Sequence, residues 1–497
     1  MAGVDDGGVP VDRLSSLPGD VLHLILLRLC SAEAAARTSF ESDVKLAVLA
    51  ALAANAAPAI RRLQVATDAD DPDATTATLL LAAPRLAGEI SFCSWPRWGD
   101  SSDDDDDDDV MPPVRSPGVV DLPCFEKATE IWLTLGLLGV ALPQSGVFAR
   151  LTSLTFRDVR FTADCDLGEV VSSARCPLLQ KLHVHASQDL CNLVIFSESL
   201  VHIELQLHGG MGEFMIVAPR LRVLDVPHCF SWRTYRSDSL VWDQPFAAVF
   251  APVLEDLIWV DAYDPASVKF GFGTERLQKV KTLPIKVYEH PRCTAHMNSV
   301  KLLQRFETVS VLQLELNYPE TMGDQQYLME AITKLPTIEV LSLVLSARGH
   351  TFGHCVFHLL KMSTGIRKLE LTLQGDHDSQ EWIMDTMWFL GHQTKTCSES
   401  CICNQSQDWK TADILDSLLE VEISGLKGSE NELAFVKQLF GWSAVLKTLT
   451  VHLHLDLTDI DDLCKELLSL GTPDTDVKIY FFHPKTSPPW KLYTPPE

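Results

Sequence analysis

The stretch VSVLQL, Val309 to Leu314, has apolar residues at its first, fourth and sixth positions. The same pattern returns as IEVLSL from Ile338 and as IRKLEL from Ile366. On a β-strand the fourth and sixth residues point to one side, and the residues between and beside them point to the other. Each copy therefore predicts a strand with one buried face and one open face.

The pattern runs through most of the 497 residues, and most copies start 21 to 33 residues apart. This spacing is close to the period of leucine-rich repeats, which is roughly 20–29 residues. We expect an α/β leucine-rich-repeat solenoid, with a parallel sheet on its concave face and helices on its convex face. The other clear copies are LTSLTF from Leu151, LQKLHV from Leu179, LVHIEL from Leu200, LRVLDV from Leu221, LEDLIW from Leu254, VKTLPI from Val280, LLEVEI from Leu418 and LKTLTV from Leu446, and weaker copies start at Ile60 and Ala128.

The segments between the copies support this interpretation. YLMEAITKLPT and HCVFHLLKMSTG have apolar residues at helical spacing, so we expect them to form convex helices. Turn-forming residues stand just before several predicted strands, at Pro219, Pro252, Pro336 and Gly365. The alternative is an ordinary α/β sheet in which the leucine spacing is coincidental. Pro284 lies inside VKTLPI and cannot donate a ladder hydrogen bond, which predicts a weak strand there.

One interval, from Ile366 to Leu418, is nearly two periods long and contains Cys397, Cys401 and Cys403 near His392. Three thiols and an imidazole are suitable zinc ligands. Their spacing lacks the paired C-x-x-C motifs typical of zinc sites. We therefore favour a solvent-side loop with reduced cysteines over zinc, and predict no metal and no cofactor.

Charge and composition limit the possible partners. The formal net charge of −26 argues against nucleic acid and anionic membranes, because both repel an acidic surface. Seven consecutive aspartates, Asp103 to Asp109, predict a disordered acidic insertion at about 99–118. The apolar run VLHLILLRL is too short to span a bilayer, and nothing before it resembles a secretory signal. Thirteen cysteines without a framework fit reduced thiols in the cytoplasm or nucleus.

Common catalytic motifs are absent from the sequence, which has no G-x-S-x-G, H-E-x-x-H, P-loop or G-x-G-x-x-G. Several histidines fall on or beside predicted strands of different repeats, where we interpret them as polar positions of the open face and not as an acid/base pair. We predict that the chain is not an enzyme and has no catalytic residues. These histidines are His183, His185, His202, His452 and His454.

The amino-terminal segment LSSLPGDVLHLILLRL, Leu14 to Leu29, resembles the first helix of the F-box, and SAEAAARTS resembles the beginning of its second helix. The repeats and the segment from Leu418 to His454 resemble the leucine-rich and FBD-type carboxyl region of plant F-box proteins. C-S-E-S-C-I-C-N before that segment also resembles a recurring feature of the group. The resemblance implies that the first helix binds a Skp-type adaptor through Leu14, Leu17, Pro18, Val21, Leu22, Ile25 and Leu26.

The sequence departs from the family after Ser39, where the F-box pattern continues with a second serine, a basic pair and a tryptophan. Here Phe40 is followed by the alanine-rich segment ESDVKLAVLAALAANAAPAIRRLQV. We therefore expect a disordered terminus at 1–11, a partial F-box at 12–40 and a solenoid at 41–455. The FBD-like region would occupy about 396–455, and a cap and tail 456–497.

For function, the resemblance implies the substrate-recognition subunit of an SCF-type E3 ubiquitin ligase. Its partners would be the adaptor, a cullin ligase and an unknown protein substrate. The alternative is a non-ligase scaffold or decoy that has lost adaptor binding because the F-box is truncated. In both cases the open face would bind a protein through positions that alternate with core residues, namely Lys181, His183, Val311, Gln313, Lys368, Glu370 and Thr450.

Overall fold

The computed structural model describes most of the chain between residues 59 and 495. Residues 1–58, 95–117, 231–245, 375–396 and 405–415 lie outside this description, as do shorter stretches of one to six residues. The predicted disordered terminus, the partial F-box and almost all of the acidic insertion therefore fall outside the described residues. The same holds for the predicted adaptor-binding residues Leu14, Leu17, Pro18, Val21, Leu22, Ile25 and Leu26.

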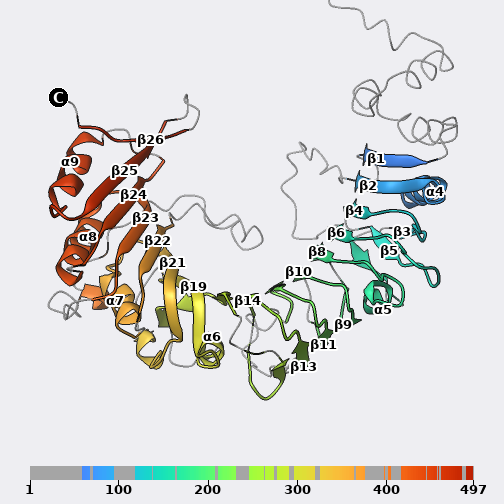
Figure 1. Ribbon diagram of the computed structural model, residues 1–497, viewed down its shortest axis with the longest axis horizontal. Helices are drawn as coiled ribbons and strands as arrows, with labels where there is room; N and C mark the ends of the chain where they lie inside the picture. The colour runs from blue at the N-terminus through green and yellow to red at the C-terminus, as the bar shows by residue number, and fades with distance from the viewer. Residues whose placement is uncertain are drawn as a thin grey trace, which may run out of the picture. The chain divides into compact units, whose positions relative to one another are not determined.

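The described chain is α/β, with a large, mostly parallel sheet and few helices (Figure 1). It divides into two compact units, and a ladder of parallel strands runs through each of them. The first unit contains the described residues up to Arg222 together with those of 228–252, and the second contains Val223–Pro227 and the chain from Val253 onward.

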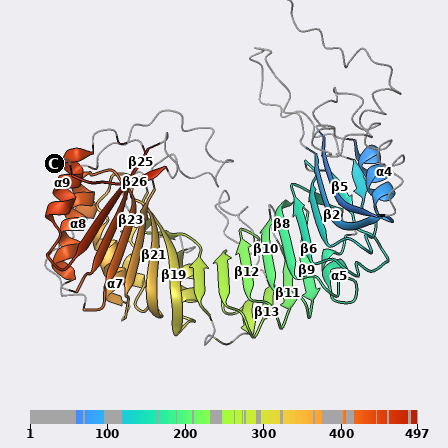
Figure 2. The ribbon, with the colours of Figure 1, turned by 45° about the horizontal axis from the view of Figure 1, so that its top comes forward.

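In the first unit, six strands form a parallel ladder in which each strand pairs with the next (Figure 2). The strands are β1 (Ile60–Thr67), β2 (Leu86–Ser94), β4 (Glu130–Thr134), β6 (Ser153–Arg157), β8 (Lys181–Ser187) and β10 (His202–Leu207).

A second parallel ladder runs through the second unit and ends in an antiparallel strand, β26 (Trp490–Leu492). Its parallel strands are β12 (Val223–Pro227), β14 (Asp256–Val260), β16 (Lys279–Thr282), β19 (Thr308–Asn317), β21 (Thr337–Ser346), β22 (Lys368–Leu373), β23 (Glu420–Leu426), β24 (Thr448–Leu453) and β25 (Asp476–Phe482). The ladder thus continues beyond residue 455. The remaining strands of the unit are β15 (Val268–Gly271), β17 (Ile285–Lys286), which pairs with β19, and the antiparallel pair β18 (Tyr288–Glu289) and β20 (Gln326–Tyr327).

Alternating burial along these strands explains why the apolar spacing predicts them. Leu312, Leu341 and Leu369 occupy the fourth position of consecutive copies, align across β19, β21 and β22, and are fully buried. The residues on either side of them along the strand are half-buried or exposed. Each strand therefore contributes the fourth and sixth residues of its sequence copy to the buried side, which leaves the other side of the sheet open.

Strands, more than helices, cover the buried side of the first ladder, which corrects the expectation of a helical convex face. Three strands of one parallel sheet and three of another lie there, with only α4 (Pro72–Ala82) and the short α5 (Leu167–Val171) as helices among the described residues. The Phe156 ring of β6 meets the Phe161 ring of one covering sheet edge to face, 5.6 Å between centroids. The covering strands are β3 (Val119–Asp121), β5 (Gly139–Ala141) and β7 (Arg160–Phe161) in one sheet and β9 (Asn192–Phe196), β11 (Glu213–Val217) and β13 (Phe246–Phe250) in the other.

For β9 and β11, the length of the return between ladder strands explains this difference. The returns from Ser187 to His202 and from Leu207 to Val223 are short, and their segments NLVIF and EFMIV alternate apolar residues as a strand does. The return from Ser346 to Lys368 is longer and has room for a helix of several turns. A strand rises about 3.3 Å per residue against 1.5 Å for a helix, so it spans the core in fewer residues.

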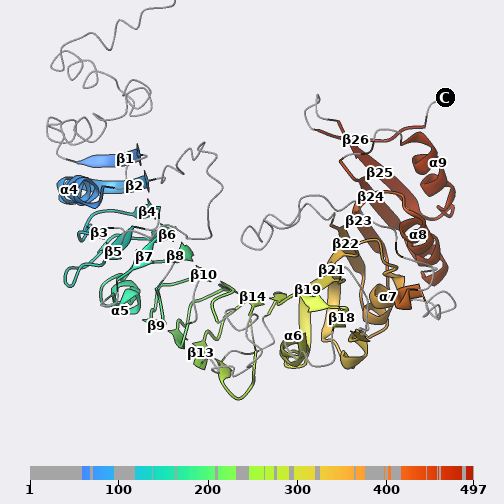
Figure 3. The same ribbon diagram turned by 180° about the vertical axis from the view of Figure 1, so that it is seen from behind.

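Helices cover the buried side of the second ladder (Figures 1 and 3). They are α6 (His296–Leu303), α7 (Gly353–Met362), α8 (Glu430–Trp442) and α9 (Asp461–Ser469). The Phe357 ring of α7 lies 4.6 Å from the Trp442 ring of α8, centroid to centroid. The prediction from HCVFHLLKMSTG is confirmed. YLMEAITKLPT was wrongly expected to be a helix, since it contains only the 3-10 turn η3 (Met329–Ala331). Tyr327 belongs to β20 at one end of the segment, and Pro336, just before β21, cannot continue a helix at the other end.

Two repeats depart from the prediction, one in its register and one because its strand was not predicted. In VKTLPI the aligned core residue is Val280, which pairs with Leu257 of β14, so the repeat begins at Leu277 and places buried Thr282 at its sixth position. A polar sixth residue hides this copy from a search for apolar spacing. Strand β2 was missed because it has one extra residue relative to β1, between the pairs Ile60–Leu86 and Arg62–Glu89, which breaks the apolar spacing. Gly88 lies at this irregularity, where an added Cβ would clash with the Arg61 carbonyl oxygen.

Candidate functional site

The seven open-face residues predicted from the sequence all lie on ladder strands, on the side opposite the buried rows. Lys181 is exposed and His183 half-buried, both on β8 of the first unit. The other five are half-buried and belong to β19, β22 and β24 of the second unit. They are Val311, Gln313, Lys368, Glu370 and Thr450.

Strand register brings several of these residues into common rows. One row of the second unit runs from Gln313 through Ser342, Glu370 and Glu422 to Thr450. A neighbouring row joins Val311 to Lys368 through Val340. Because parallel strands in register repeat their side-chain directions, this face presents one half-exposed surface of mixed polar character.

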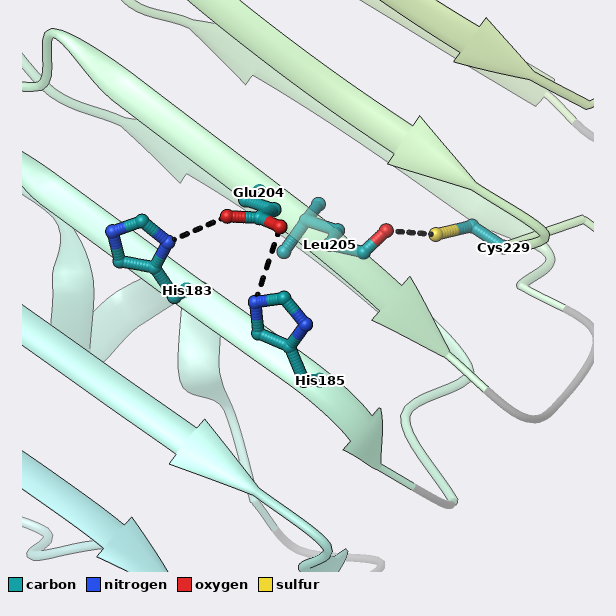
Figure 4. Close-up of polar contacts among 5 residues, drawn as sticks. All are labelled: His183, His185, Glu204, Leu205 and Cys229. Atoms are coloured by element: carbon teal, nitrogen blue, oxygen red, sulfur yellow. Dashed lines mark hydrogen bonds and ion pairs between the residues drawn. The ribbon is translucent and has the colours of Figure 1, made fainter. Parts of the chain in front are cut away.

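The first unit carries a histidine cluster on its open face (Figure 4). His183 Nδ1 lies 2.9 Å from Glu204 Oε2, and His185 Nε2 lies 3.4 Å from the other carboxylate oxygen. The His202 ring lies 5.0 Å from that of His183. Nearby, the Cys229 thiol donates to the Leu205 carbonyl oxygen at 3.1 Å.

His183, His185 and His202 keep the open-face positions expected of them, but the structure gathers these three around one carboxylate and does not leave them on separate parts of the face. His183 and His185 alternate on β8, and β10 places Glu204 directly opposite His183. Glu204 was not singled out from the sequence, although it stands at the fifth position of LVHIEL, where the pattern predicts an open-face residue. Burial raises the pKa of Glu204, but the hydrogen bond with His183 and the charge of the neighbouring histidines outweigh it, so this pKa lies below its usual value.

Trp132, on β4, is another open-face residue that was not singled out. It stands in the same row as His183, separated by Thr155, and is 44% exposed. The Arg157 guanidinium lies 5.8 Å from the centre of its ring. A large aromatic side chain held half-exposed is typical of protein-binding surfaces.

In the second unit, charges pair along the open face. Lys368 Nζ lies 2.7 Å from Glu370 Oε1 and 3.1 Å from Glu422 Oε2. His452 stacks on Tyr480, with 4.9 Å between ring centroids, and its Nε2 lies 3.8 Å from Glu422. The hydrogen bond to Glu370 raises the pKa of Lys368, so this amine keeps its charge at neutral pH.

Four metal-ligating side chains meet near the end of β21. The thiols of Cys397, Cys401 and Cys403 surround the imidazole of His350, and the four donor atoms all lie within 4.8 Å of one another. His350 Nδ1 lies 3.2 Å from Cys397 Sγ and 3.6 Å from the other two sulfurs, and Cys397 Sγ lies 3.4 Å from Cys403 Sγ. His392, the imidazole expected from the sequence, lies outside the described residues. The only signal for His350 in the sequence is its place in the turn after a predicted strand.

The thiols of this group differ in their acidity. Burial raises the pKa of Cys397 and of Cys403 above the usual value. Burial also acts on Cys401, but hydrogen bonds from the backbone and from Cys397 outweigh it and hold that pKa below its usual value. Cys401 is therefore the thiol of the group that ionises most readily.

No protein-family model matches the chain. No curated protein gives a significant match to it. None of the helices in the part of the chain that the structure describes has the length and hydropathy needed to cross a membrane.

Proposed function

We propose that the chain recognises another protein through the open face of a leucine-rich-repeat-type solenoid, and that it does so as the substrate-recognition subunit of an SCF-type ubiquitin ligase. The observation that carries the first part is the alignment of half-exposed side chains in rows across consecutive parallel strands. The second part rests on the resemblance of Leu14 to Leu29 to the F-box helix.

Mixed rows of this kind suit a protein partner. In the second unit, Lys368 lies between Glu370 and Glu422, while Gln313 and Ser342 add uncharged hydrogen-bonding groups. In the first unit, Trp132 and the histidine cluster supply aromatic area beside a carboxylate. A partner that buries such a surface gains contact area from the aromatic rings and specificity from the placed charges.

In this proposal the chain catalyses no reaction itself, and the transfer of ubiquitin is done by other subunits. The chain works in the cytoplasm or nucleus, where its thiols stay reduced. The exposed Cys191 supports this, since it is a free thiol.

The open face is tested by capturing the partner protein with two charge-altering variants. Thr450→Arg places a long cation in the central row of the open face, and we expect it to abolish capture. Lys361→Glu, at an exposed position of α7 on the other side of the sheet, is the matched control and should leave capture unchanged. Loss of capture in the control with retention in Thr450→Arg would place recognition on the helical side and contradict the proposal.

Adaptor binding separates the ligase subunit from a non-ligase scaffold or decoy. Ordering a poorly supported helix on binding subtracts about 0.5–1.5 kcal/mol per immobilised side chain. We expect the chain to bind a Skp-type adaptor weakly or not at all, and insertion of complete second and third F-box helices after Ser39 to restore binding. Leu22→Asp in the restored chain should abolish it again.

Titration calorimetry of adaptor binding gives a different outcome for each of the two functions. Tight binding by the chain as it stands, lost on Leu22→Asp, supports the ligase subunit. A chain that captures its partner protein through the open face but binds no adaptor until the complete helices are inserted is a scaffold or decoy.

A further inference from the structure

The group formed by His350, Cys397, Cys401 and Cys403 has the donor chemistry of a structural zinc site. Zinc takes thiolate sulfur at about 2.3 Å and imidazole nitrogen at about 2.0–2.1 Å in tetrahedral geometry, so neighbouring donors lie roughly 3.5–3.8 Å apart. The nitrogen-to-sulfur separations here are 3.2, 3.6 and 3.6 Å, and one sulfur pair is 3.4 Å apart. The four donors therefore surround a space that suits a single ion.

Contacts outside the four donors hold both sides of the group. The turn before His350 has left-handed backbone at Arg348, with φ 48°, and at Gly349, with φ 77°, and the His350 N–H donates to the Ala347 carbonyl at 2.9 Å. The His350 ring stacks on Tyr318, 5.8 Å away and tilted by 17°. The Thr351 hydroxyl donates to the Cys403 carbonyl at 2.8 Å, and this bond attaches Cys403 to the turn that carries His350.

Burial also distinguishes this group from an ordinary surface loop. His350 is 6% exposed and Cys403 4% exposed. Polar groups that are withdrawn from water to this degree are normally satisfied by one another or by a metal. A buried imidazole surrounded by three thiols meets that requirement fully when a cation occupies the centre.

Other uses of these side chains fit less well. A disulfide between Cys397 and Cys403 would need the sulfurs at about 2.0 Å instead of 3.4 Å, and it would leave the third thiol and the imidazole out of the chemistry. In an iron–sulfur cluster the thiolates ligate more than one iron. Donors gathered around one point instead match a single metal ion.

We propose that His350, Cys397, Cys401 and Cys403 bind one zinc ion that fastens the three cysteines to the turn following β21. Four protein donors close the coordination sphere, so the ion is structural and activates no water. Residues separated by 47 to 53 positions in the chain are joined at this point. Zinc binding then adds to the stability of the second unit, because the site forms only in the folded chain.

The first test uses the full chain, expressed in zinc-supplemented medium and purified with a reductant. Elemental analysis is expected to find about one zinc per chain, as a single four-donor site requires. Replacement by Co²⁺ should give the visible bands of a tetrahedral cobalt site together with thiolate-to-cobalt charge transfer. A chain with no stoichiometric zinc and no thiolate–cobalt absorption, or one that holds iron instead, overturns the proposal.

Variants then locate the ion. His350→Gln and Cys401→Ser should each lose the zinc, while Cys191→Ser, at an exposed cysteine elsewhere, should retain it. His183→Ala is the second control, because His183, His185 and Glu204 form the other described group that could hold a metal. Zinc that survives in His350→Gln and disappears in His183→Ala would place the ion on the open face and refute this assignment. If the cluster variants do not fold, the cobalt spectrum of the unaltered chain still decides the question.

Discussion

Two neighbouring residues of β22, Leu369 and Lys368, have opposite environments. Leu369 is fully buried between Leu341 and Val421. Leu369→Asp is expected to destabilise the second unit by several kcal/mol, because it buries a carboxylate without a partner. Urea unfolding followed by circular dichroism measures the loss.

The matched control is Lys368→Gln. A lysine-to-aspartate change at this position would set a third carboxylate beside Glu370 and Glu422, whereas glutamine removes the charge without adding repulsion. Lys368 is a partly exposed ion-pair residue, so we expect a cost within about 1 kcal/mol. Equal unfolding midpoints for the two variants would show that the assigned register of the strand is wrong.

Helix α8 begins with a capping box, which the sequence S-E-N-E contains although it was not singled out. The Ser429 hydroxyl accepts from the Glu432 N–H at 3.4 Å, and the Glu432 carboxylate accepts from the N–H groups of Ser429 and Lys427, both at 3.0 Å. Ser429→Ala is expected to destabilise the second unit by about 1 kcal/mol, the usual cost of losing such a cap. The difference is read from the thermal unfolding midpoint.

A serine at the other end of a helix provides the comparison for this element. The Ser469 hydroxyl donates only to the Glu466 carbonyl in the last turn of α9, at an exposed position. Ser469→Ala should therefore change stability by less than about 0.5 kcal/mol. A Ser429→Ala variant as stable as Ser469→Ala would mean that packing, not the cap, determines where α8 begins.

At the scale of the whole molecule, the ladder of the second unit needs a closed end. Strand β26 pairs antiparallel with β25, and α9 buries Cys464 and Leu467. A chain that ends at Leu455 loses these elements and leaves β24 as an unpaired edge beside exposed core. We expect this shortened chain to self-associate, since bare sheet edges and uncapped repeats promote aggregation.

Light scattering after size-exclusion chromatography measures this self-association. A chain that ends at Tyr493 keeps β26 and the contact of the Tyr493 hydroxyl with Asp461, and should elute like the unaltered chain. A monodisperse chain ending at Leu455 would show that the last parallel strand is dispensable.

The strands were predictable because the information that specifies them is local. Spacing of apolar residues alone predicts β19, β21, β22, β23 and β24 in their observed register, since each strand buries alternate residues wherever its neighbours lie. Where one local feature departed from the pattern, as at Thr282 or Gly88, the register was misread or the strand missed.

The sequence by itself determined most of the ladder strands and which of their residues face the core, because alternation along a strand is a property of a few consecutive residues. Tertiary structure decided which distant side chains meet. The short separation of His392 from the cysteines suggested that residue as their partner, yet the described structure places His350 there. Glu204 similarly joins His183 only because β10 lies beside β8. Such groups depend on strand stacking and turn placement, which arise from burial of the whole core and leave no periodic signal in the chain.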